Sequence, residues 1–266
     1  MDAHTSKTTV HYVEHGAGRP VVILHGAGVD HREAEACFET SFAGATGIRR
    51  IYPDLPGMGR TPAPAEIRSA EDVLTVLLEF AERVSDGRPY LVAGHSAGAY
   101  FAQAMAERRP AQVAGLALIC PLLPDLGEVP EHRVVLGSGD LGDEEFRGYF
   151  VVQTPEMVER YERFVMPGMG LVDEAAMERI AARWELAPGE GMPFDGPTLV
   201  VAGRLDSTVG FAAAMELVDR YSRATAAVLD DAGHALPHEQ PGVLRALIED
   251  WVARVERHNR AVPLVG

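Results

Sequence analysis

The chain has 266 residues, near the upper limit for a single hydrophobic core, so we expect one domain that carries an insertion rather than two independent domains. Hydrophobic residues make up 47% and charged residues 24%, values typical of soluble globular proteins and unlike those of disordered or fibrous chains. The formal net charge of -15 repels nucleic acids and anionic membrane surfaces, so we expect neither as a partner.

The two cysteines, Cys37 and Cys120, lie in unlike contexts, which is typical of buried free thiols in a reducing compartment. Neither is accompanied by a cluster of metal ligands, so we expect no metal. The segment from Met1 to Lys7 has no apolar signal region, and no apolar stretch reaches the ~20 residues that cross a bilayer. We therefore expect a cytoplasmic protein without a membrane partner, and the oligomeric state is left open.

Short apolar runs rich in β-branched residues predict strands along the chain. In chain order these runs are Val10 to Glu14, Pro20 to Leu24, Arg50 to Tyr52, Tyr90 to Ala93, Val113 to Ile119, Thr198 to Ala202 and Ala226 to Leu229. Amphipathic segments between them predict helices, and two of these open with capping signals, Asp30 with Glu33 and Ser69 with Asp72. This alternation predicts an α/β fold in which a mostly parallel central sheet is covered by helices on both faces.

The alternation stops between about residues 124 and 193, where helical patterns dominate, with helix starts at Thr154 and Asp173. We predict an α/β core of residues 1–123 and 194–266, interrupted by a helical cap of residues 124–193. The cap segment holds six of the 18 aromatic residues and five of the nine methionines. Such apolar bulk suits a lid over an apolar pocket, and it equally suits a subdomain that needs its own core.

A nucleophile is predicted at Ser96. The apolar run from Tyr90 to Ala93 leads into Gly94-His95-Ser96-Ala97-Gly98 and then into a helix of small residues. A strand that turns abruptly into a helix holds the serine in a strained conformation and exposes it at the carboxyl end of the strand, a nucleophile elbow. A serine between glycines is usually only a turn, so this prediction depends on the strand-to-helix context.

A serine hydroxyl needs a general base, and the base is predicted at His234, in the loop between the last apolar run and the terminal helix. His238 is the one serious rival. His25 and His95 neighbour the site but precede key turns, so we interpret both as structural.

The base needs an orienting acid, which is predicted at Asp206, where the chain leaves the strand from Thr198 to Ala202. Asp206 could instead cap the following helix, and Asp230 or Asp231 could be the orienting carboxylate. The order Ser96, Asp206, His234 along the chain is the nucleophile-acid-base order of the α/β-hydrolase fold.

Two backbone N–H groups are predicted to form an oxyanion hole. Ala97 begins the helix after Ser96, where its N–H points at developing negative charge. Ala27 lies in the turn His25-Gly26-Ala27-Gly28, whose glycines allow the backbone to approach a reacting carbonyl oxygen.

Four segments in this order resemble the α/β-hydrolase superfamily, in its serine-nucleophile branch with a helical cap. They are Val22 to Gly28, Tyr52 to Thr61, Gly94 to Gly98, and the paired loops Gly203 to Asp206 and Gly233-His234. The resemblance implies that Asp54 is structural and that the cap follows the strand ending near Cys120. Because a serine stands at 96, the aspartate-dependent dehalogenases and epoxide hydrolases are disfavoured.

Other departures weaken further subfamilies. Proline iminopeptidases and meta-cleavage hydrolases usually carry glycine-proline-rich oxyanion turns, whereas this chain has Gly26-Ala27-Gly28-Val29. Hydroxynitrile lyases of this fold rely on a cap lysine, whereas the only lysine here is Lys7.

The expected function is therefore that of a cofactor-free, carboxylesterase-like serine hydrolase that acts on an ester, lactone or similar carbonyl of a small hydrophobic substrate. A lyase, cyclase or acyltransferase with the same catalytic triad is the first alternative, and a ligand-binding receptor is the second. The aromatic residues of the cap are candidates for substrate contact, and four of these are singled out: Phe146, Phe150, Tyr161 and Trp184.

Overall fold

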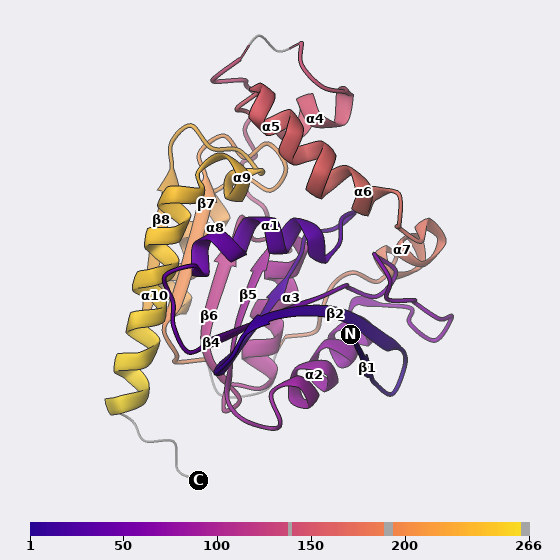
Figure 1. Cartoon of the computed structure of the whole chain (residues 1–266), viewed down its shortest axis with the longest axis vertical. Coiled ribbons are helices and arrows are strands. Elements are labelled where there is room, and N and C mark those ends of the chain that lie inside the picture. Colours follow the sequence, from indigo (N-terminus) through magenta and orange to yellow (C-terminus); the bar gives the residue numbers. More distant parts are fainter. Residues whose placement is uncertain (138–139, 189–193, 262–266) are drawn as a thin grey trace.

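A twisted sheet of eight strands runs through the molecule (Figure 1). A computed structural model describes residues 1–137, 140–188 and 194–261 of the chain. The strand order is β1-β2-β4-β3-β5-β6-β7-β8; β2 pairs antiparallel with β1 and β4, and every other pair is parallel. The strands are β1 (Asp2–His4), β2 (Thr9–Gly16), β3 (Arg19–Leu24), β4 (Ile48–Pro53), β5 (Tyr90–His95), β6 (Val113–Ile119), β7 (Thr198–Gly203) and β8 (Ala224–Leu229).

The central strands are apolar along their whole length because helices cover both of their faces. Every residue of β5, β6 and β7 is buried. This arrangement confirms the predicted fold class. The short edge strand β1 was not predicted, because three residues with two polar side chains carry no recognisable pattern.

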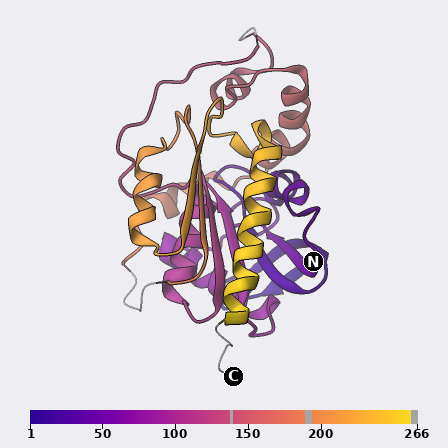
Figure 2. The same ribbon diagram turned by 90° about the vertical axis from the view of Figure 1, so that its left-hand side faces the viewer.

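The helices form two layers around the sheet (Figure 2). Helices α1 (His31–Phe42) and α10 (Pro241–Ala261) pack on one face, and α2 (Ala70–Val84), α3 (Ala97–Arg108) and α8 (Ala212–Arg220) pack on the other. Trp251 of α10 is fully buried, and its indole N–H donates to the carbonyl of Pro197 at 3.0 Å. Among the described residues, no helix combines the length and the apolar character that a bilayer span requires.

The predicted capping signals of the core are present. The Asp30 side chain accepts a hydrogen bond from the N–H of Arg32 at the start of α1, and Ser69 accepts one from the N–H of Asp72 at the start of α2. Each bond satisfies a backbone donor that has no partner within the helix.

The segment between β6 and β7 contains helices, and residues 144–169 of it lie above the carboxyl ends of the strands (Figure 1). Its described elements are α4 (Glu144–Tyr149), α5 (Pro155–Arg160), the π-helix η1 (Tyr161–Val165), α6 (Met166–Met169) and α7 (Glu174–Ala181). The expected helix starts are present, because Thr154 and Asp173 cap α5 and α7. Residues 138–139 and 189–193 of the predicted cap lie outside the described residues, and the domain boundaries stay predictions.

A small apolar cluster supports this segment from within. It joins Phe146, Phe150, Met157, Tyr161 and Val165 to two residues of the core, Val29 and Ala235. The insertion therefore has a core of its own, and the same core reaches down to the sheet edge.

Two glycines in helices provide a matched test of how tightly the core is packed. A Cβ added at Gly98 of α3 would lie 2.3 Å from the carbonyl oxygen of Leu24, whereas one added at Gly148 of α4 would meet no atom within 4 Å. We expect Gly98→Ala to lower the free energy of unfolding by about 1–3 kcal/mol through overpacking. Gly148→Ala should raise it by up to about 1 kcal/mol, because alanine is the better helix former. Urea denaturation measures both changes, and equal effects would contradict the packing described here.

Candidate active site

Ser96 lies at the abrupt turn between β5 and α3. Its φ of 55° is in the left-handed region, which a non-glycine residue adopts only when its surroundings enforce it. The surroundings do so here, since its N–H donates to the carbonyl of Ile119 at 3.0 Å and its carbonyl accepts from the N–H of Leu122 at 3.2 Å. A Cβ at Gly94 would lie 2.2 Å from the carbonyl oxygen of Gly98, so the turn closes only with glycine at that position.

The structure brings Ser96 together with His234 and Asp206. The His234 Nε2 atom lies 2.9 Å from the Ser96 Oγ atom, and the His234 Nδ1 atom lies 2.8 Å from the Asp206 Oδ2 atom. The loops after β7 and β8 carry the acid and the histidine, and they touch closely: a Cβ at Gly203 would lie 2.4 Å from the carbonyl oxygen of Gly233. Three side chains distant in sequence thus form one hydrogen-bonded chain.

Asp206 is fully buried and is nevertheless favoured as the carboxylate. Burial by itself would raise its pKa, but the hydrogen bond to His234 and two backbone N–H donors outweigh burial, so the pKa of Asp206 is lowered. The two donors are the N–H groups of Thr208 and Val209, each 2.9 Å from Oδ1. The alternative acids Asp230 and Asp231 are both exposed, and Asp206 is the carboxylate bonded to His234.

The rival base His238 lies elsewhere. It is fully buried; its Nε2 atom lies 3.3 Å from Cys37 Sγ, and its Nδ1 atom accepts a hydrogen bond from Arg160 Nε at 3.2 Å. Both ring nitrogens of His238 therefore contact groups other than Ser96.

Of the two residues predicted to supply the oxyanion donors, Ala97 directly follows Ser96, and Ala27 follows Gly26, where an added Cβ would lie 3.5 Å from the Ser96 Cβ. Ala97 is the first residue of α3, so its N–H is one of those without a partner inside the helix. The turn containing Ala27 is held by His25, whose Nε2 accepts from the N–H of Leu55 at 2.9 Å. The other ring nitrogen, Nδ1, therefore carries the proton and donates to the carbonyl of Gly26 at 2.7 Å.

A cavity of about 230 Å³ opens in front of Ser96. This volume is small for a ligand site and suits a small molecule. Apolar and aromatic side chains dominate its wall. Its lining residues are Gly26, Ala27, Gly28, Val29, His95, Ser96, Glu145, Tyr149, Tyr161, Val165, Met169 and His234.

Only one of the four predicted substrate contacts, Tyr161, lines this cavity. Phe146 and Phe150 are fully buried and stack on each other behind it, with ring centroids 4.8 Å apart. Trp184 packs against Tyr100 instead, and its carbonyl accepts a hydrogen bond from the Tyr100 hydroxyl at 3.2 Å. The structure therefore places three of the four away from the cavity wall.

The cavity-lining residues that the sequence analysis did not single out come from the same segment and the turn after β3. They include Val29, Tyr149, Val165 and Met169. Their type carried a signal, since aromatic residues and methionines are enriched in the insertion, but no signal showed which of them face Ser96.

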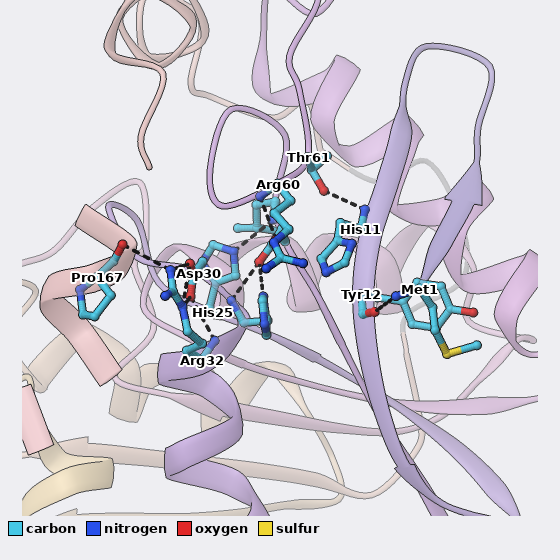
Figure 3. Close-up of polar contacts among 12 residues, drawn as sticks. Met1, His11, Tyr12, His25, Asp30, Arg32, Arg60, Thr61 and Pro167 are labelled. Carbon is cyan, nitrogen blue, oxygen red and sulfur yellow. Dashed lines mark hydrogen bonds and ion pairs between the residues drawn. The ribbon is translucent and has the colours of Figure 1, made fainter. Parts of the chain in front are cut away.

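Two polar anchors attach the insertion to the core beside the cavity. Arg32 pairs with Asp30 and donates to the carbonyl of Pro167 in α6 at 3.1 Å (Figure 3). On the other side Glu239 accepts from the N–H of Val151 and from the N–H of Gly233, each at 2.7 Å. The second anchor joins the insertion directly to the loop of His234.

Asp54 supports the turn after β4. Its carboxylate accepts hydrogen bonds from the backbone N–H groups of His31 at 2.9 Å and Arg60 at 2.8 Å, and its Oδ1 lies 2.7 Å from His31 Nδ1. Its contacts are those of a structural residue, as the resemblance implied.

Three groups of described residues place possible metal-ligand atoms close together: His95 with Cys120 and His234, His11 with His31 and Asp54, and Glu33 with Cys37 and His238. In each group, hydrogen bonds already occupy at least one of the ligand atoms.

Comparison with known proteins supports these observations. Residues 21–247 match the Alpha/beta hydrolase family. The chain is 23% identical to the (E)-2-((N-methylformamido)methylene)succinate hydrolase of Acinetobacter baylyi, over 93% of this chain and 95% of that protein. It is 26% identical to the 2-hydroxymuconate semialdehyde hydrolase of a Pseudomonas species, over 94% of this chain and 92% of that protein.

A solved α/β superfamily hydrolase from Oenococcus oeni superposes with a TM-score of 0.85 at 23% identity, covering 96% of this chain and 99% of that one. Three observations point to the same family: the fold, the order of its elements and the family match over most of the chain. The chain therefore belongs to the alpha/beta hydrolase family.

Proposed function

We propose that this protein is a serine hydrolase that cleaves an ester, lactone or similar carbonyl of a small uncharged substrate through an acyl-enzyme. The observation that carries the proposal is the hydrogen-bonded chain from Ser96 Oγ through His234 to Asp206, which opens onto a cavity of small-molecule size. The hydrolase relatives support an enzymatic function of this class.

The proposed reaction begins when Ser96 Oγ attacks the carbonyl carbon while His234 Nε2 takes the hydroxyl proton. The N–H groups of Ala27 and Ala97 stabilise the resulting oxyanion. The tetrahedral intermediate collapses, the C–O bond to the leaving group breaks, and His234 returns the proton to the departing alkoxide. Water then attacks the acyl-enzyme with His234 again as base, which releases the acid and regenerates Ser96. The buried Asp206 carboxylate orients His234 and stabilises its protonated form in both steps.

The insertion of residues 124–193 is proposed to act as the cap that selects the substrate. Its helices supply Tyr149, Tyr161, Val165 and Met169 to the cavity wall, and its two anchors hold it over the carboxyl edge of the sheet. This wall favours an apolar acyl or alkyl group.

The proposal of an uncharged substrate rests on the charges around the cavity. Its lining residues, among the part of the chain that the structure describes, include no lysine or arginine, and the one ionisable acid on the wall is Glu145. The two hydrolase relatives are named for substrates that carry carboxylate groups, a succinate and a muconate semialdehyde. A carboxylate would meet no lysine or arginine here, so we propose a substrate preference that differs from theirs.

Labelling with a fluorophosphonate tests the nucleophile. We expect the parent protein to be labelled at Ser96 and Ser96→Ala to be unlabelled, with kcat for small p-nitrophenyl esters reduced by at least about 10³-fold. Ser222→Ala is the matched control, since Ser222 is exposed and its hydroxyl donates to Asp195. Equal labelling of the parent and Ser96→Ala, both folded by circular dichroism, would exclude Ser96 as the nucleophile.

The orienting acid is tested by a pair of isosteric changes. Asp206→Asn should lower kcat by about 10²- to 10⁴-fold, because an amide can fix His234 in the wrong tautomer. Asp231→Asn should leave kcat within about twofold, because Asp231 is exposed and asparagine tolerates its positive φ of 52°. Steady-state kinetics at one pH compare the two, and a larger loss in Asp231→Asn would reassign the acid.

The charge preference is tested with esters of similar length. We expect kcat/KM for p-nitrophenyl butyrate to exceed that for mono-p-nitrophenyl succinate by at least about tenfold, because the succinate carboxylate approaches Glu145 without a lysine or arginine to pair with. Glu145→Gln should narrow the ratio by about two- to fivefold, as expected for a partly screened charge. Glu144→Gln changes a neighbouring charge off the cavity wall and should leave the ratio unchanged. A preference for the succinate ester would contradict the proposal.

A further inference from the structure

A buried polar cluster lies behind the Ser96 site, and the proposed reaction does not use it. It consists of Glu33 and Cys37 from α1, His95 at the end of β5, and His238 from α9 (Leu236–Glu239). None of the four is more than 2% exposed. Burying a carboxylate and two imidazoles costs free energy unless each charge has a counter-charge and each proton has an acceptor. The contacts in the cluster therefore indicate which of its atoms carry protons.

The proton positions follow from the partners of each ring. His95 Nε2 lies 2.9 Å from the carbonyl oxygen of His234, and because a carbonyl can only accept, Nε2 carries a proton. The other nitrogen, Nδ1, lies 3.5 Å from Glu33 Oε1. A neutral ring would turn its Nδ1 lone pair toward that buried carboxylate, which is repulsive, whereas a second proton makes the contact an ion pair.

The partners of the His238 ring show in the same way which of its nitrogens carries the proton. Its Nδ1 accepts from Arg160 Nε at 3.2 Å, so the proton of the neutral ring lies on Nε2, which faces Glu33 Oε1 at 3.6 Å. A protonated Nε2 is not a metal ligand, and a metal-bound histidine normally donates from its other nitrogen rather than accepting there. The contact to Arg160 therefore favours a hydrogen-bonded cluster over a metal site made of Glu33, Cys37 and His238.

The direction of each pKa agrees with this pattern. Burial lowers the pKa of both histidines, but Glu33 outweighs burial at His95, whose pKa is raised, and does not at His238, whose pKa is lowered. Burial would raise the pKa of Glu33, and its contacts with the two histidines instead hold that pKa well below its usual value. Burial raises the pKa of the Cys37 thiol, which stays neutral.

We propose that His95 is a positioning residue for His234, present as an imidazolium whose counter-ion is the buried Glu33 carboxylate. The effect of His95 on kinetics rests on the proposed function, whereas its protonation state does not. His95 acts through two contacts: its Nε2–H holds the backbone carbonyl of His234, and its ring lies against the His234 ring with centroids 4.9 Å apart at 36°.

The orientation of the ion pair between His95 and Glu33 affects the protonation of His234. Its positive end, His95, faces the His234 ring, while Glu33 lies on the far side of His95. A neighbouring positive charge disfavours a second one, so the charge on His95 opposes the addition of a proton to the adjacent His234 ring. Among the described residues, the ionisable groups near His95 besides His234 include Glu33 of α1, Asp206 after β7, Cys120 after β6 and His238 of α9.

The protonation state is tested first in the unmodified protein. Long-range ¹H–¹⁵N correlation spectra of protein labelled at histidine distinguish an imidazolium, with both ring nitrogens protonated, from either neutral tautomer. We expect His95 to be doubly protonated at pH 7 and His238 to be protonated at Nε2 only; His95→Gln identifies the His95 signals by their loss. An unprotonated His95 Nδ1 at pH 7 would overturn the proposal, whether or not the protein hydrolyses esters.

The kinetic test separates the charge from the hydrogen bond. In Glu33→Gln we expect a neutral His95, so the midpoint of the acid limb of the kcat/KM profile should rise by about 0.5–1 pH unit. His95→Gln keeps a donor for the His234 carbonyl without the charge, whereas His95→Leu loses both. His95→Gln should therefore retain at least about tenfold more kcat than His95→Leu, with its acid limb also moved upward.

Cys37→Ala is the matched control, because it changes the same cluster and leaves the ion pair intact. Its acid limb should coincide with that of the parent. A fall in kcat of Glu33→Gln and His95→Gln without any movement of the acid limb would mean that the cluster only supports packing, and this would overturn the proposal. If instead Ser96→Ala keeps full activity, the proposed function fails while the spectra still decide the state of His95.

Discussion

The backbone turn at Ser96 is the constraint on which the rest of the site depends. A strand that becomes a helix within one residue forces a positive φ on that residue and brings the backbone of β5 against that of α3. The turn is possible because Gly94 and Gly98 leave room at backbone contact distance, and it persists because neighbouring carbonyl and N–H groups satisfy Ser96 on both sides. Packing of the sheet therefore stabilises a conformation that the serine alone would avoid.

The parallel sheet converts this local turn into a site. Parallel strands end at the same edge, so the loops after β3, β5, β7 and β8 meet there even though they are far apart along the chain. The close backbone contact between Gly203 and Gly233 then brings the loop of Asp206 to the loop of His234. The insertion closes the same edge from above through the anchors at Arg32 and Glu239.

Charge is managed differently inside the site and on the surface. The chain is strongly acidic, but its buried carboxylates at the site, Asp206 and Glu33, each face a histidine. The wall of the cavity between them and the insertion is largely apolar; its polar members are Ser96, the two histidines His95 and His234, Glu145 and two tyrosines. Removing water from such a wall strengthens each remaining electrostatic contact, which is why the protonation of the histidines matters for the proposed chemistry.

The fold and the central residues could be predicted because they depend on local chemistry. Apolar β-branched runs, capping residues and the glycines around Ser96 each act over a few residues, so the strand and helix order was readable. The edge strand β1 was not, since its pairing with β2 gives it a structure that its own residues do not favour. Asp206 could be ranked above Asp230 and Asp231, but the hydrogen bond to His234 appears only in the tertiary structure.

Tertiary packing alone determined which residues line the cavity and which form the buried polar cluster behind it. Phe146, Tyr149 and Phe150 lie within little more than one helical turn, and only the docking of α4 on the core turns Tyr149 to the cavity and the two phenylalanines away from it. Likewise, His95 was interpretable in sequence only as a neighbour of Ser96. Its pairing with Glu33 joins α1 to the end of β5, two segments distant in sequence, and no local pattern records that contact.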